Sequence, residues 1–206
     1  MSHEYYKPLD AIRGLLALAV VLYHAKWAGV LSTNAFAQNG YLAVDVFFCL
    51  SGFLMFTLYR SISTGAEAKT FMIKRFARLY PLHFFTLIVG LLYAVARLIA
   101  HKAGLPLLEA GEAIPLTADS HENLGTFLSN LTLTQGLGLH DRLSYNGPSW
   151  SISTEFFTYI IFAAVMIVLP IKKTWHFVVI GSLSALIYFG LSVIRPNLDI
   201  TYDLGL

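Results

Sequence analysis

The chain has 206 residues, of which 56% are hydrophobic and 13% are charged, and its mean hydropathy is +0.64. Soluble domains carry about 25% charged residues, so this composition excludes an ordinary soluble domain and favours a polytopic membrane protein. The formal net charge is only +2 and the basic residues form no continuous stripe, so we expect no nucleic-acid partner.

Several apolar segments are long enough, at about 20 residues, to cross a lipid bilayer as helices. Four are clear, at residues 9–30, 41–59, 79–100 and 152–169, and a fifth candidate covers residues 175–194. Residues 124–139 are uncharged but short and interrupted by polar residues and glycines, which favours an interfacial or re-entrant segment. We therefore predict an all-α transmembrane bundle of about five spans, forming a single domain over residues 1–206.

The basic residues predict the orientation of these spans. Loops that face the cytoplasm are enriched in Lys and Arg. Segment 60–78 contains Arg60, Lys69, Lys74, Arg75 and Arg78, and Lys172 and Lys173 lie between the fourth and fifth spans. We therefore expect both segments and the N-terminus to be cytoplasmic, the acidic loop 101–147 to face outward, and the protein to be integral to the cytoplasmic (inner) membrane.

The first apolar segment contains both a cation and a titratable imidazole. Arg13 and His24 are eleven positions apart, which places them within roughly 20° of the same helical face. At about 1.5 Å per residue they differ in depth by about 16 Å, with Arg13 nearer the cytoplasm. Ionisable residues inside a membrane are costly and indicate a functional site, although an interfacial anchor is an alternative for Arg13. Asp10 lies three residues before Arg13 and can pair with it.

Asp45 lies near the outer end of the second span, which we expect to bring it roughly level with His24. A carboxylate there can accept a hydrogen bond from one imidazole nitrogen and leave the other nitrogen to take a proton. This is a general-base arrangement. The alternative is that Asp45 caps the start of its helix.

Arg75 and Arg78 are three positions apart, so they share one side of a helix that enters the membrane. Two guanidinium groups can bind phosphate oxygens in a bidentate manner, which suits a phosphorylated cytosolic ligand. Spacing alone gives more weight to the alternative, in which both residues follow the positive-inside rule and contact lipid head groups.

The start of the fourth span, residues 148–155, reads Pro-Ser-Trp-Ser-Ile-Ser-Thr-Glu. Ser151 and Glu155 share a helical face, and Trp150 can lie at the interface or stack on a ligand ring. We expect Glu155 in the outer layer, about as deep as His24. The loop histidines His121 and His140 do not have metal-ligand spacing, so we predict no metal site.

Taken in order, five motifs closely resemble the membrane acyltransferase 3 family. They are Leu9-Asp10-Ala11-Ile12-Arg13-Gly14, then His24, then Val44-Asp45-Val46-Phe47-Phe48-Cys49-Leu50-Ser51-Gly52-Phe53, then Arg75-Phe76-Ala77-Arg78-Leu79-Tyr80-Pro81, and Pro148-Ser149-Trp150-Ser151-Ile152-Ser153-Thr154-Glu155. The resemblance covers residues 9 to about 165. It implies an inner-membrane O-acyltransferase fold of about ten helices, of which this chain is expected to be the amino-terminal half.

The resemblance also implies an activity and roles for named residues. Members of the family move an acyl group, commonly acetyl, from cytosolic acyl-CoA to an extracytoplasmic acceptor that is usually a sugar. Arg13 and His24 correspond to the family's Arg-x10-His pair, and Arg75 and Arg78 to its Arg-x-x-Arg motif. His24 is then the expected catalytic residue, and the arginines are expected to bind the donor.

Three hypotheses follow for the function. In the first, acetyl-CoA or another acyl-CoA binds at Arg75, Arg78 and Arg13, while His24 deprotonates the acceptor hydroxyl or carries the acyl group, with Asp45 or Glu155 orienting it. We favour the base. Trp150 and Ser151 would line the acceptor port. In the second, His24, Asp45 and Glu155 relay protons in a proton-coupled transporter. In the third, the chain is a non-catalytic acyl-CoA-binding subunit.

Overall fold

The structure is a computed structural model, and it describes residues 7–24, 34–106, 108, 112–169 and 174–194. Within these ranges the regular secondary structure is helical and no strand occurs, which confirms the predicted all-α class. The chain divides into two compact units, unit 1 at residues 1–61 and unit 2 at residues 62–206.

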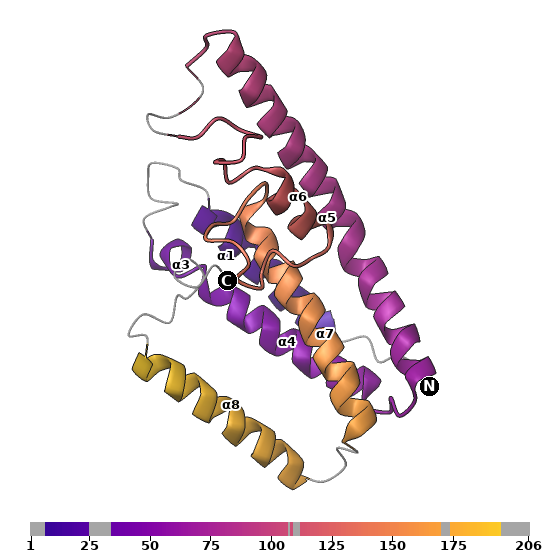
Figure 1. The fold of residues 1–206 in the computed structure, drawn as a ribbon. Helices are drawn as coiled ribbons and strands as arrows, with labels where there is room; N and C mark the ends of the chain where they lie inside the picture. Colours follow the sequence, from indigo (N-terminus) through magenta and orange to yellow (C-terminus); the bar gives the residue numbers. More distant parts are fainter. Residues whose placement is uncertain (1–6, 25–33, 107, 109–111, 170–173, 195–206) are drawn as a thin grey trace. The chain divides into compact units, whose positions relative to one another are not determined.

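Unit 1 contains α1 (Lys7–His24), the short α3 (Ala35–Gln38) and α4 (Leu42–Tyr59), and α1 contacts both other helices (Figure 1). Asn34 caps α3, because its Oδ1 accepts a hydrogen bond of 2.9 Å from the Ala37 backbone nitrogen. Gly40 allows a close approach: a Cβ added there would lie 2.4 Å from the Ala19 carbonyl oxygen. The turn before α4 is therefore held against α1.

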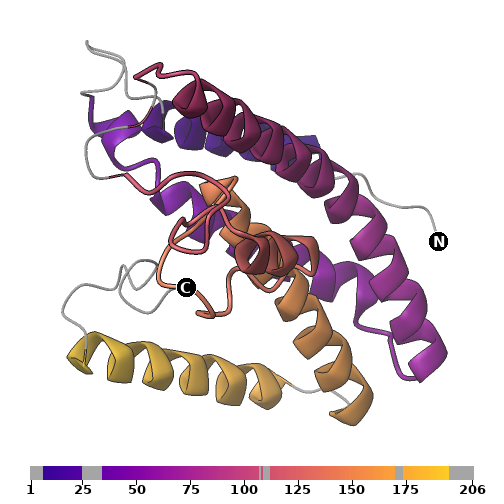
Figure 2. The same ribbon diagram turned by 45° about the horizontal axis from the view of Figure 1, so that its top comes forward.

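Unit 2 contains α5 (Gly65–Lys102), α6 (Leu124–Leu131), a short 3-10 turn η1 (Gly147–Ser149), α7 (Trp150–Val168) and α8 (Thr174–Ile194). Helices α5 and α7 run antiparallel side by side, which Figures 1 and 2 show from two directions. Two pairs of rings fix their register. The Phe71 and Phe162 centroids are 5.6 Å apart, and those of Phe76 and Phe156 are 6.0 Å apart.

Helix α5 is longer than the span predicted within it. A capping box starts it, because the Thr64 hydroxyl accepts from the Glu67 backbone nitrogen at 3.3 Å and Glu67 accepts from the Thr64 backbone nitrogen at 3.1 Å. The helix then continues through Pro81 for 38 residues. At 1.5 Å per residue it is about 57 Å long, against a hydrocarbon core of about 30 Å. The predicted span, residues 79–100, is therefore only the apolar part of a longer helix.

Three helices of the described chain are long and apolar enough to cross a membrane: Leu42–Tyr59, Gly65–Lys102 and Gly147–Val168. They correspond to the second, third and fourth predicted spans, at residues 41–59, 79–100 and 152–169, with ends that differ by one residue or more. The first and fifth predicted spans overlap helices α1 and α8, although residues 25–30 of the first span lie outside the described residues. The total of five spans, like the single domain over residues 1–206, stays a prediction.

Candidate functional site

His24 is the last residue of α1, and its ring is tied to the helix backbone. Its Nδ1 lies 2.9 Å from the carbonyl oxygen of Val20, one turn earlier. A carbonyl oxygen can only accept a hydrogen bond, so Nδ1 carries the proton in this contact, and a neutral ring keeps a lone pair on Nε2. The ring of Tyr23 meets that of His24 edge-on, with centroids 5.2 Å apart. His24 is thus an oriented imidazole with an exposed side chain.

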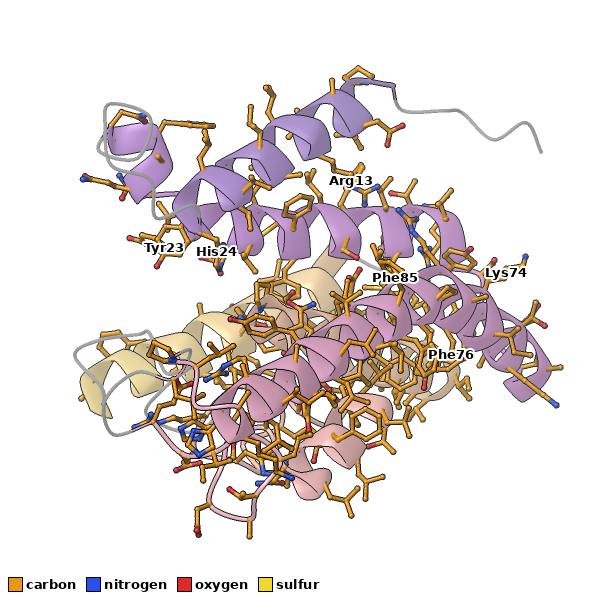
Figure 3. All side chains as sticks on the ribbon, turned by 90° about the horizontal axis from the view of Figure 1, so that it is seen from above. Arg13, Tyr23, His24, Lys74, Phe76 and Phe85 are labelled. Carbon is orange, nitrogen blue, oxygen red and sulfur yellow. The ribbon has the colours of Figure 1, made fainter. Side chains whose placement is uncertain are left out.

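Arg13 lies at a different level along α1 from His24, as Figure 3 shows. Its guanidinium is 3.9 Å from the Asp10 carboxylate, and the two side chains are 23% and 48% exposed. This confirms the predicted pairing of Asp10 with Arg13. A pair this exposed stabilises the helix only slightly.

Asp45 lies on α4, in the same unit as His24, and its side chain is exposed. The structure describes both residues and places no hydrogen bond between them; the one contact that it gives the His24 ring nitrogens within the described residues is that of Nδ1 with the Val20 carbonyl. The reason is local, because an acceptor four residues back on the same helix is always within reach. The N-cap residue of α4 is Tyr41, and Asp45 lies in the first turn of the helix.

Arg75 and Arg78 are separated by burial, although they are only one turn apart. Arg75 is 9% exposed, whereas Arg78 is exposed, as is Lys74, whose side chain extends outward from α5 in Figure 3. The Arg75 Cζ lies 5.5 Å from the centroid of the Phe71 ring and 5.4 Å from that of Tyr159. The predicted fork therefore consists of one arginine fixed between aromatic rings and one on the surface.

Glu155 and Arg75, both in unit 2, contact the same tyrosine, and the expectation that Glu155 lies about as deep as His24 stays a prediction. The Tyr159 hydroxyl donates a hydrogen bond to Glu155 Oε1, and the same Tyr159 ring lies against the Arg75 guanidinium. Phe76 and Phe156, which directly follow Arg75 and Glu155 in the sequence, are in ring contact, so this turn of α5 and this turn of α7 lie at the same level. Arg75 is in the packed part of α5 rather than at its end, which the hydropathy pattern did not show.

The start of α7 is joined to the middle of α5 through Asn130. Ser149 precedes α7, and its hydroxyl donates to Asn130 Oδ1 at 3.3 Å, while His83 Nε2 lies 2.7 Å from the Asn130 carbonyl oxygen. His83 is eight residues after Arg75 on α5, or about 12 Å along the axis. Trp150 and Ser151, the predicted acceptor-binding residues, therefore begin α7 at a level well short of a full bilayer thickness from Arg75.

Segment 124–149 packs against the middle of α5 through buried polar side chains. His83, Asn130, Gln135, Ser149 and Ser153 are all at most 5% exposed. Such groups are costly to bury unless they are hydrogen-bonded, and most of them are. Helix α6 has eight residues, too few to cross, and it meets α5 within residues 79–100. The interfacial or re-entrant placement of residues 124–139 in the bilayer stays a prediction. Further contacts join Tyr80 to Leu131, Thr86 to Asn146 and Asn123 to Tyr145.

A second buried arginine fixes the acidic loop to α5. Arg97 is 9% exposed and pairs with Glu112 and, at 3.3 Å, with Glu122. We assigned these acids only to an outward-facing loop, because the pairs join residues 15 and 25 positions apart that no helical spacing relates. Glu109, also predicted in this loop, lies outside the described residues.

Ser153 is the most completely buried polar side chain near the start of α7, at 0% exposed. Its hydroxyl donates to the Leu133 carbonyl at 2.6 Å and accepts from the Gly136 backbone nitrogen at 3.1 Å. Leu133 has φ +58°, a left-handed conformation that is costly without glycine, so this hydroxyl holds a strained turn. The backbone at Gly136 also packs closely against the start of α7, since a Cβ at Gly136 would lie 2.8 Å from the Trp150 carbonyl oxygen.

Ser153→Ala is therefore expected to destabilise the protein by about 1–3 kcal/mol, because it leaves a buried carbonyl and a buried N–H without their partner. Thermal unfolding in detergent measures this as a lower melting temperature. Ser151→Ala is the matched control, since the Ser151 hydroxyl bonds locally to the Pro148 carbonyl at 2.9 Å and is solvent-exposed. Equal melting temperatures for the two variants would contradict the role of Ser153.

Comparison with known proteins agrees with these motifs. The sequence matches the acyltransferase 3 family model, described as an acyltransferase domain, over residues 6–199. It is 28% identical over 170 residues to the peptidoglycan O-acetyltransferase OatA of Listeria monocytogenes, covering 81% of this chain and 25% of that protein. No solved structure matches the chain.

Two further relatives differ in length. Protein 2 in the picA locus of Rhizobium radiobacter is 32% identical over 169 residues, covering 75% of this chain and 79% of the relative. The acyltransferase MdmB of Streptomyces mycarofaciens is 30% identical over 139 residues, covering 66% of this chain and 32% of that protein. The chain thus spans about a quarter of OatA and about a third of MdmB.

Proposed function

The chain belongs to the acyltransferase 3 family, and from this membership we propose that it is a membrane-bound O-acyltransferase that moves an acyl group from cytosolic acyl-CoA to a hydroxyl of an extracytoplasmic carbohydrate or glycosylated acceptor. Two of its relatives are named as a peptidoglycan O-acetyltransferase and an acyltransferase, which supports transfer to a hydroxyl. Acetyl is the expected acyl group, and acetyl-CoA the expected donor.

The geometry of His24 is the observation that carries this proposal. The Nδ1 contact with Val20 selects the tautomer whose Nε2 can accept a proton. A base of this type suits the deprotonation of a sugar hydroxyl as it attacks. We assign His24 to that role.

The reaction balances with this one base. His24 Nε2 takes the hydroxyl proton while the hydroxyl oxygen attacks the carbonyl carbon of the thioester. The new C–O bond forms, the C–S bond breaks, and the proton passes from His24 to the departing coenzyme A thiolate. Asp45, exposed on α4 in the same unit, is the proposed carboxylate that stabilises the charged ring during this step.

The donor and acceptor are assigned to different side chains. Arg75 and Arg78 are proposed to bind the donor's phosphates, with Arg13 contributing, because guanidinium groups match phosphate oxygens. Trp150 and Ser151 are proposed to bind the acceptor, Trp150 by stacking on a sugar ring. Glu155 is proposed as a second carboxylate that can orient His24, and it also accepts a hydrogen bond from the Tyr159 hydroxyl.

The position of the basic residues supports a donor on the cytoplasmic side. Three described helices are long and apolar enough to cross a bilayer, and five basic residues lie in segment 60–78 between the first two of them or at the start of the second. The positive-inside rule then favours a cytoplasmic N-terminus and insertion in the inner membrane, with the lipid bilayer as the surrounding partner.

Proteoliposomes that contain the full protein provide the test. With acetyl-CoA labelled in the acetyl group and a soluble saccharide acceptor, we expect label in the acceptor and release of free coenzyme A. Vesicles without the protein are the control. Ion or solute flux without acyl turnover would favour the transporter instead, and bound acetyl-CoA without turnover would favour a binding subunit.

A further inference from the structure

We infer that Tyr159 is a positioning residue for the acyl donor: its ring holds the guanidinium of Arg75, and its hydroxyl connects that ring to Glu155. The inference rests on the proposed function, in which Arg75 binds phosphates of the donor. It adds to that function a residue that no sequence pattern had indicated.

The Arg75 guanidinium is buried between two aromatic rings that come from different helices. Phe71 lies one turn earlier on α5 and Tyr159 lies on α7, with their ring centroids 5.5 Å and 5.4 Å from the Arg75 Cζ. A charge that is only 9% exposed is costly to bury, and the negative faces of aromatic rings offset part of that cost. The position of this cation therefore depends on how α5 packs against α7.

Tyr159 itself is held at both ends. It is 2% exposed, and its ring meets the Phe71 ring at 77° with centroids 5.8 Å apart, which is a favourable edge-to-face contact. At the far end of the ring, the hydroxyl donates to Glu155 Oε1 one turn earlier on α7. A ring fixed in this way can set the position of the guanidinium beside it.

Ring contact and phosphate binding make different demands on an arginine. An aromatic ring attracts the flat face of the guanidinium, whereas a phosphate is bound through the N–H groups in its plane. One side chain can therefore satisfy both. A guanidinium that is already held also loses less conformational freedom when the anion binds, which favours affinity.

Glu155 strengthens this arrangement through the hydroxyl. A phenol that donates to a carboxylate becomes richer in electron density, because hydrogen bonds in a sequence polarise one another. The Tyr159 ring then attracts the cation more strongly. The order Glu155, Tyr159, Arg75 thus connects an acid on α7 with the proposed phosphate-binding residue on α5.

The test measures the affinity of the purified full protein for coenzyme A, together with KM and kcat for acetyl-CoA. Tyr159→Leu removes the ring and is expected to weaken binding about five- to thirty-fold, the range for loss of one buried cation–π contact. Tyr159→Phe keeps the ring and loses only the hydroxyl, so it is expected to stay within about three-fold of wild type. Phe162→Leu is the matched control, because the Phe162 ring contacts Phe71.

A purely structural role predicts a different pattern. Tyr159→Leu and Phe162→Leu would then lower the melting temperature and leave the affinity of the folded protein unchanged, which would overturn the inference. In our proposal Tyr159→Leu raises the KM for acetyl-CoA far more than it lowers kcat, and Tyr159→Phe restores it. Should Tyr159→Leu fail to fold, Phe71→Leu removes the other ring, with the same expected loss of affinity and the same contradicting result.

The outcome for wild type separates this inference from the function on which it rests. Wild-type protein that does not bind coenzyme A would refute the proposed donor and this role together. Wild-type protein that binds coenzyme A with the same affinity as Tyr159→Leu would refute the role of Tyr159 alone.

Discussion

Replacing His24 with alanine is expected to lower the rate of acyl transfer by about 10²- to 10⁴-fold, the usual contribution of a well-placed general base. The wild-type ring is held by the Val20 carbonyl in the tautomer that presents a lone pair at Nε2. Alanine has no proton acceptor, so the hydroxyl has to attack without assistance. The measurement is the initial rate at which labelled acetyl enters the acceptor in proteoliposomes.

The fold should survive this substitution. His24 is exposed at the end of α1, where loss of one hydrogen bond to the helix backbone has little effect on stability. His101→Ala is the matched control, because His101 is an exposed histidine in the last turn of α5. A His24→Ala protein that unfolds at the wild-type temperature and still transfers acetyl at the wild-type rate would refute the assignment.

Replacing Arg75 with alanine is expected to weaken the binding of coenzyme A about ten- to hundred-fold, since hydrogen bonds to a charged group each contribute about 1.5–3 kcal/mol. Arg75→Lys should recover only a minor part of this affinity. Lysine keeps the positive charge, but it has no flat surface to lie between Phe71 and Tyr159 and no paired N–H donors for a phosphate. Isothermal titration of the purified protein with coenzyme A measures these affinities.

Lys74→Ala provides the control for charge. Lys74 precedes Arg75 and carries the same charge, but it is exposed, so its loss should change the affinity by less than about two-fold. The loss of affinity in Arg78→Ala should fall between those in Lys74→Ala and Arg75→Ala. Arg78 is exposed, so water weakens its attraction to a phosphate more than it weakens that of the buried Arg75. Equal losses for Lys74→Ala and Arg75→Ala would show that only net charge matters and would refute a specific phosphate site.

The features that the sequence predicted correctly depend on short-range geometry. Hydropathy alone indicated helices at residues 41–59 and 152–169, because a segment must satisfy its own backbone in a membrane. The pair of Asp10 with Arg13 followed from one turn of helix. The acyltransferase motifs likewise selected a family that the match over residues 6–199 confirms.

The contacts of residues 124–149 could not be predicted from local sequence patterns. The sequence indicated that this segment does not cross, but not which residues hold it. Ser153, Gln135 and Asn130 have no unusual spacing, and each becomes informative only when a chain segment folds back onto it. The one available signal was the presence of amides and glycines in an otherwise apolar stretch.

The sequence by itself thus determined the helical class, the membrane character, and which polar residues share a face on any one helix, because helical periodicity and hydropathy are properties of neighbouring residues. Only the tertiary structure decided how far α7 is displaced along α5, and hence that Tyr159 lies between Arg75 and Glu155. Periodicity fixes the angle of a side chain around its own axis. The axial offset between two helices is set by the packing of Phe71, Phe76 and their partners across some 80 residues of chain, which no local pattern records.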